Sequence, residues 1–150
     1  MKLGKIAIAA LAATVFMFLT DGLWYGIIMK NSMTPMPGAR PEPDMMWLVI
    51  GMLIYCFAFA YVFVMGRGSG SPAGEGARFG FWATLLVWIP MGFFWYALIA
   101  AAPLQEYLID DVFRLIQTVV IGIIVAYLTG MGGDRGEVIK SGKGTTSGDD

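Results

Sequence analysis

The stretch that decides the fold runs from Met45 to Met65 and reads MMWLVIGMLIYCFAFAYVFVM. It contains no charged residue. A helix needs about 20 mostly apolar residues to cross the hydrocarbon core of a bilayer, so this stretch alone predicts a membrane-spanning helix. The strands of a membrane barrel need only about 10 residues of alternating polarity, and this run is continuous, which argues against a barrel.

Similar apolar runs lie on both sides of this stretch. They predict four membrane-spanning helices, at residues 6–29, 45–65, 79–102 and 108–130. The chain is 57% hydrophobic and 14% charged, whereas soluble domains average about 45–50% and about 25%. Residues 1–131 are therefore expected to form one all-α domain, an integral membrane four-helix bundle.

Two polar segments are rich in glycine. Residues 66–76 combine glycine with serine and predict a flexible connection between the second and third helices. Residues 132–150 have little apolar surface to bury and predict a disordered cytoplasmic tail.

The start of the first run is similar to a signal peptide. Lys2 and Lys5 precede an alanine-rich stretch, and Ala10-Leu11-Ala12 fits a cleavage pattern of small residues. The apolar core of a signal peptide is usually about 7–15 residues long, whereas this run continues to Met29. We therefore expect an uncleaved first helix.

Basic residues gather on one side of the four predicted helices. That side has Lys2, Lys5, Arg67, Arg78, Arg135, Lys140 and Lys143. The loops on the opposite side have only Lys30 and Arg40. Because cytoplasmic segments are enriched in lysine and arginine, both termini are predicted to be cytoplasmic.

Aromatic residues flank the loops of the opposite side. They are Trp24, Tyr25, Trp47, Trp95, Tyr96 and Tyr107. Trp and Tyr prefer the membrane–water interface because their side chains are partly apolar and partly polar. We expect these residues to serve as interfacial anchors.

The two halves of the chain resemble each other. Trp24-Tyr25-Gly26-Ile27-Ile28 matches Trp95-Tyr96-Ala97-Leu98-Ile99, and Ala60-Tyr61-Val62 matches Ala126-Tyr127-Leu128. The matches favour two tandem helical hairpins in a parallel repeat, because each half would contain two spans. Chance matching in a biased composition is the alternative.

Asp21 is the most unusual residue of the first run, because an unpaired carboxylate inside a bilayer is costly. Arg114 is predicted to lie at a similar depth in the fourth helix, and Gln117 follows three residues later on the same face. We predict a polar cluster of Asp21, Arg114 and Gln117, with Asp110 and Asp111 near its mouth. The cluster is either a structural ion pair that fixes helix register, or a binding site or an ion-linked gate.

Small residues recur at helical spacing in the first and fourth runs. They are Ala9, Ala13, Thr118, Gly122, Ala126 and Gly130. Small side chains let membrane helices approach closely, so these positions predict helix packing.

Several function classes lack their usual residues. The sequence has no histidine and one cysteine, Cys56, which we interpret as a small buried apolar side chain. It has no Walker motif and no dinucleotide fingerprint. The net charge of −1 does not point to nucleic acid. We therefore expect no enzymatic activity, no cofactor, no metal and no nucleic-acid partner.

Three segments resemble a family of small four-helix bacterial membrane proteins known only as a domain of unknown function. They are Gly22-Leu23-Trp24-Tyr25, Gly76-Ala77-Arg78-Phe79-Gly80-Phe81-Trp82, and residues 110–122. The resemblance implies four spans in a bacterial inner (plasma) membrane. It implies no activity, so no functional residue is carried over.

Three function classes follow from these observations. The first is a non-enzymatic accessory or structural subunit of a larger membrane complex, whose partners are the bilayer and other membrane subunits or a second copy. The second is a small oligomeric transporter or channel component with a polar site at Asp21 and Arg114. The third and least favoured is a membrane enzyme that uses Asp21, Asp110 and Asp111 without histidine.

Overall fold

The computed structural model describes residues 3–40, 42–99 and 102–130, and over these ranges the chain is helical with no strand. Its elements are α1 (Leu3–Leu23), the short π-helix η1 (Trp24–Ile28), α2 (Met45–Gly66), α3 (Pro72–Ile99) and α4 (Leu104–Leu128). The predicted all-α four-helix bundle is confirmed. The predicted disordered tail, residues 132–150, lies outside the described residues.

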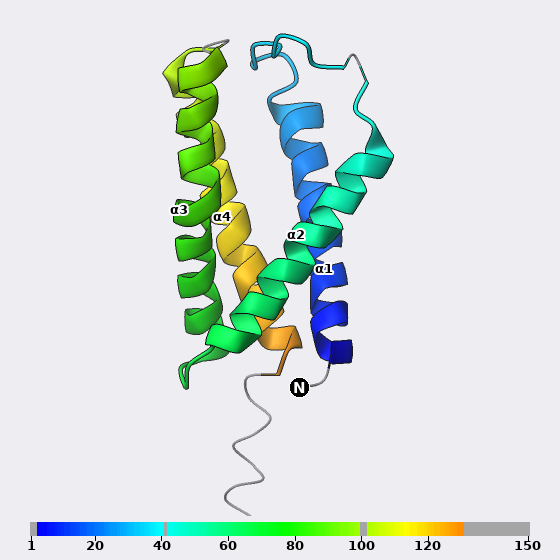
Figure 1. Cartoon of the computed structure of the whole chain (residues 1–150), viewed down its shortest axis with the longest axis vertical. Helices are drawn as coiled ribbons and strands as arrows, with labels where there is room; N and C mark the ends of the chain where they lie inside the picture. Colours follow the sequence, from blue (N-terminus) through cyan, green and yellow to red (C-terminus); the bar gives the residue numbers. More distant parts are fainter. Residues whose placement is uncertain (1–2, 41, 100–101, 131–150) are drawn as a thin grey trace, which may run out of the picture.

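The four helices run alternately up and down. The first turn of α1 and the last turn of α4 lie at the same end of the bundle, and α2 crosses α1 diagonally (Figure 1). α3 and α4 lie side by side, and α4 contacts α1, α2 and α3. α4 therefore contacts each of the other helices in the described part of the chain.

Three stretches of helix are long and apolar enough to cross a membrane. They are Leu3–Ile28, Met45–Gly66 and Pro72–Ile99. α4 differs from them because its first half carries Glu106, Asp110, Asp111 and Arg114, and because it presents a buried face to the other helices. That α4 also spans a membrane stays a prediction.

The boundary of the third helix departs most from the prediction. α3 begins at Pro72 rather than at residue 79, so the predicted flexible connection over 66–76 is wrong for its second half. The Ser71 hydroxyl oxygen accepts a hydrogen bond from the backbone N–H of Gly74 at 3.2 Å, and proline is favoured in the first turn of a helix. The fourth helix likewise begins at Leu104 rather than at residue 108 and ends at Leu128.

The apolar core lies mainly among α1, α2 and α4. Its fully buried members include Ala9, Ala13, Cys56, Phe63, Ile121, Val125 and Ala126. Ala9, Ala13 and Ala126 are thus buried, and so is Cys56, as its apolar interpretation predicted. From α3, Phe79, Ala83 and Trp88 pack against this core from one side.

α3 and α4 meet backbone to backbone. A Cβ atom built at Gly76 would lie 2.3 Å from the carbonyl oxygen of Gly122, and one at Gly80 would lie 2.4 Å from that of Thr118. The predicted packing positions Thr118 and Gly122 are therefore in contact with glycines of α3. Gly130 instead follows α4 with a φ of 78°, a left-handed conformation that favours glycine.

Candidate functional site

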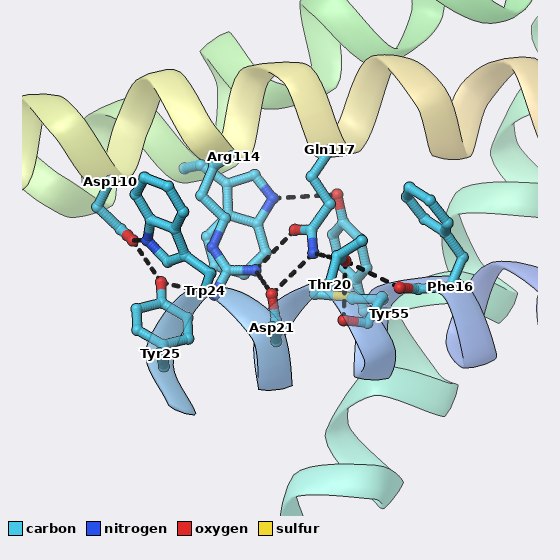
Figure 2. Close-up of polar contacts among 11 residues, drawn as sticks. Phe16, Thr20, Asp21, Trp24, Tyr25, Tyr55, Asp110, Arg114 and Gln117 are labelled. Atoms are coloured by element: carbon cyan, nitrogen blue, oxygen red, sulfur yellow. Dashed lines mark hydrogen bonds and ion pairs between the residues drawn. The ribbon is translucent and has the colours of Figure 1, made fainter. Parts of the chain in front are cut away.

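Polar side chains gather where α1 and η1 face α4. Thr20, Asp21, Trp24 and Tyr25 are spaced to lie on one side of the first helix. Asp110, Arg114 and Gln117 are spaced to do the same on α4. Figure 2 shows the side chains of the two helices pointing toward each other.

Arg114 is the centre of this group. One terminal nitrogen of its guanidinium donates to Asp21 Oδ1 and to Gln117 Oε1, both at 2.8 Å. The other donates to the Tyr25 hydroxyl at 3.0 Å. Gln117 Nε2 in turn donates to Asp21 Oδ1 and to Thr20 Oγ1, both at 2.7 Å. The structure thus brings the predicted Asp21, Arg114 and Gln117 together (Figure 2).

Asp110 extends the group toward the end of the bundle where the α1–α2 loop lies. Its Oδ1 accepts hydrogen bonds from the Tyr25 hydroxyl and from Trp24 Nε1, the latter at 3.2 Å. Trp24 also stacks on Phe113 of α4, with ring centroids 4.4 Å apart. Trp24 and Tyr25, predicted as interfacial anchors, therefore bond to α4.

The other predicted anchors have different surroundings. The rings of Tyr96 on α3 and Tyr107 on α4 pack edge to face, with their centroids 5.8 Å apart. Trp95 lines a cavity between α3 and α4. Trp47 is 63% exposed. Their contact with a membrane interface stays a prediction.

Aromatic rings surround the charge of Arg114. Its Cζ lies 4.5 Å from the centre of the Trp88 ring, 5.4 Å from that of Tyr25 and 5.5 Å from that of Phe113. Cations are attracted to the faces of aromatic rings at such distances. Arg114 Nε is buried, and no hydrogen-bond partner for it is found in the described part of the chain. The guanidinium is thus held by an ion pair, hydrogen bonds and rings.

The burial of these side chains determines how much stability is lost when one of their contacts is broken. The side chains of Asp21 and Arg114 are about nine-tenths buried. Removing one partner of a buried ion pair leaves an uncompensated charge, so such a pair is costly to break even where it adds little net stability. The Asp21–Arg114 contact joins the first hairpin to the last helix and ties the two halves of the bundle together.

A cavity of about 260 Å³ adjoins the network on the side of α3 and α4. Its lining includes Trp88, Trp95, Asp111 and Arg114, together with Met33, Thr34 and Met36 of the α1–α2 loop. The loop is held there because the backbone N–H and the hydroxyl of Thr34 donate to Glu106 at 2.9 and 3.0 Å.

A second, more open cavity of about 600 Å³ lies on the other side of the network, lined by residues of α1, α2 and α3. Tyr25, Trp88 and Arg114 line both cavities. These three side chains therefore stand between the two spaces.

Sequence reasoning missed several members of the network. Tyr25 lies four residues after Asp21, on the same helix face, and that spacing was the available signal. Trp88 gives no comparable signal, because an aromatic residue in an apolar run packs equally well in a core or against lipid.

No known protein-family model matches this sequence, and neither the comparison with curated proteins nor the comparison with solved structures yields a match. The resemblance to a family of bacterial four-helix membrane proteins stays a prediction. Within the described ranges, no group of three or more His, Cys, Asp and Glu residues is placed to hold a metal ion.

Proposed function

We propose that this chain is a non-enzymatic integral membrane protein that serves as an accessory or structural subunit of a larger membrane complex. One observation carries the proposal: Asp21, Arg114 and Gln117 bond to one another inside the bundle. Side chains occupied in this way hold helices in register and are not free for acid–base or nucleophilic chemistry.

The placement of α4 supports a membrane role for all four helices. α4 lies alongside α3, which is long and apolar enough to span. Its Asp111, Arg114 and Gln117 are buried in the bundle, so a surrounding bilayer would not meet their polar groups. Its exposed positions include Val112 and Ile116, which suit contact with lipid.

The exposed surface of α3 is suited to contact with a partner subunit. α3 buries little beyond its contacts with α4 and with the apolar core. The exposed large side chains of α3 that line neither cavity include Phe81, Trp82, Leu86, Phe93, Phe94 and Leu98. Aromatic side chains are enriched at protein interfaces, so this face suits another membrane subunit as well as lipid.

Extraction in a mild detergent followed by native mass spectrometry tests the accessory role. We expect the chain to be recovered with larger subunits in fixed stoichiometry. Leu86→Trp, at a position that is 79% exposed on α3, is expected to lower that recovery at least about threefold by steric conflict. Leu19→Trp on α1, at a position that is 64% exposed, is the matched control and should leave recovery unchanged. Recovery of this chain alone would contradict the proposal.

A small oligomeric transporter or channel component is the second candidate. The observation that favours it is the pair of cavities on either side of Tyr25, Trp88 and Arg114. A homo-oligomer recovered without other subunits, with solute flux in proteoliposomes, would select this candidate over the first.

We further propose a bacterial inner-membrane location with both ends of the chain in the cytoplasm. In a Cys56→Ala background, Ser32→Cys places a thiol in the α1–α2 loop and Ser71→Cys places one between α2 and α3, both at exposed positions. A membrane-impermeant maleimide applied to spheroplasts is expected to label Ser32→Cys at least about tenfold faster than Ser71→Cys, because the reagent cannot reach the cytoplasmic face. Faster labelling of the second would reverse the orientation.

A further inference from the structure

Among the carboxylates that line the cavities, Asp111 is the one for which the described residues provide no ion-pair or hydrogen-bond partner. Its side chain lines the 260 Å³ cavity, and the residue is only 9% exposed. No hydrogen bond or ion pair to its carboxylate is found in the described part of the chain. Both carboxylate oxygens lie 3.0 Å from the point where a Cβ atom would stand at Gly92 of α3. A side chain at position 92 would crowd the carboxylate, and glycine leaves it room.

The neighbouring charges of the cavity are already engaged. Glu106 accepts from Thr34, and Asp110 accepts from Tyr25 and Trp24. Arg114, the only basic residue of the described lining, is paired with Asp21. The lining therefore carries an excess of negative charge, concentrated at Asp111. A buried unpaired carboxylate is costly, and a bound cation would remove that cost.

The walls of the cavity indicate which kind of cation fits. They carry the aromatic residues Tyr25, Trp88, Trp95 and Tyr107 and the methionines Met33, Met36 and Met91. Aromatic faces attract alkylated ammonium groups, and thioethers give adaptable, polarizable contacts. Ions such as Ca²⁺ and Mg²⁺ instead need six or more oxygen ligands, and most of this lining is carbon and sulfur. The volume of about 260 Å³ suits a small ligand.

We infer that this cavity binds a small alkylated ammonium group, with Asp111 as its counter-charge and the Trp88 and Trp95 rings as its walls. The α1–α2 loop, held by Thr34 on Glu106, closes the site over the bound cation. The ammonium group belongs either to a free organic cation or to a lipid headgroup that enters from the membrane surface. The inference goes beyond the proposed function, because an accessory subunit and a transporter can each have such a site.

Titration calorimetry of the whole chain in dodecyl maltoside, a detergent without a charged headgroup, tests the site. The probes are choline and its uncharged isostere 3,3-dimethylbutan-1-ol. We expect saturable choline binding and at least about tenfold weaker binding of the alcohol, because only choline has a charge for Asp111 and the rings. Equal affinity for the two probes, or no binding of choline, would overturn the inference.

Three variants locate the binding. Asp111→Asn keeps the shape of the side chain but removes its charge, and is expected to weaken choline binding about 30-fold. Asp111→Glu keeps the charge, so its choline affinity should stay within about threefold of that of the natural chain. Trp95→Leu should weaken binding about fivefold, because it removes an aromatic wall of the site. Glu75→Gln, at the opposite end of α3, is the matched loss of a carboxylate and should leave affinity unchanged.

Each variant is first checked for helical content. If Asp111→Asn does not fold, Asp111→Glu and Trp95→Leu still decide the question, because a site elsewhere would leave choline affinity unchanged in Trp95→Leu. A short-chain phosphatidylcholine then separates the two sources. At least about tenfold tighter binding than choline assigns the site to a lipid headgroup, and equal binding assigns it to a free cation.

Discussion

Replacing Arg114 with methionine is expected to lower the free energy of unfolding by about 3–5 kcal/mol, because it leaves the Asp21 carboxylate buried without its counter-charge. Methionine keeps much of the apolar volume of arginine, so the cost reports mainly on lost charge and hydrogen bonds. The Tyr25 hydroxyl and the Gln117 side-chain oxygen would each lose a donor at the same time. Unfolding in mixed detergent–SDS micelles, followed by tryptophan fluorescence, measures the change.

The energy of the pair itself requires a double-mutant cycle. Asp21→Asn keeps an oxygen that can accept from Gln117 but removes the negative charge. We expect the effects of Asp21→Asn and Arg114→Met on the free energy of unfolding to be non-additive by about 2 kcal/mol. The reason is that either substitution alone already removes the ion pair, so the second one loses less. Additive effects of the two substitutions would show that the carboxylate and the guanidinium are not coupled.

Arg40→Met is the control for a generic loss of positive charge. Arg40 pairs with Asp44 at 3.2 Å in the α1–α2 loop, but its side chain is 71% exposed. Exposed pairs contribute only about 0–1 kcal/mol, so this variant should unfold close to the natural chain. A loss as large as that of Arg114→Met would mean that burial does not set the cost.

The Asp21–Arg114 contact could be predicted because charge is scarce in the apolar runs. A carboxylate inside a long apolar helix needs a partner, and Arg114 was the basic residue of suitable depth. The aromatic members could not be predicted in the same way. Tyr25 and Trp24 have the composition of interfacial anchors, and the choice between lipid and α4 depends on how the helix is rotated.

Helix rotation is hard to predict here because the runs are apolar on every side. In a soluble helix the polar face marks the outside, but α2 has no charged residue from Met45 to Gly66 and so no such mark. α4 is the exception, since Asp111, Arg114, Gln117 and Thr118 define its buried face. The face of α4 could therefore be predicted, whereas those of α2 and α3 could not.

Glycine misled the prediction of where α3 begins. Gly74 and Gly76 lie in a glycine-rich stretch that is typical of a flexible connection, yet both are helical. The informative signal was the spacing of Gly76 and Gly80, two small residues four apart that let membrane helices approach closely. That spacing becomes decisive only when a matching surface, here Thr118 and Gly122, is known to face it.

Replacing Gly122 with alanine is expected to destabilise the bundle by about 1–3 kcal/mol, because the added methyl group has no space. The new Cβ would lie 2.1 Å from the carbonyl oxygen of Gly76. That oxygen belongs to the backbone of α3 and cannot rotate away as a side chain would, so the two helices must separate. Gly51→Ala on α2 is the matched control, because no atom lies within 4 Å of its added Cβ, and the better helix propensity of alanine should stabilise it by up to about 1 kcal/mol. The two identical substitutions thus differ in sign in the same unfolding assay, and equal effects would show that α3 and α4 do not meet at this point.

Separation of α3 from α4 would also widen the cavity between them, so Gly122→Ala should weaken choline binding whereas Gly51→Ala should not.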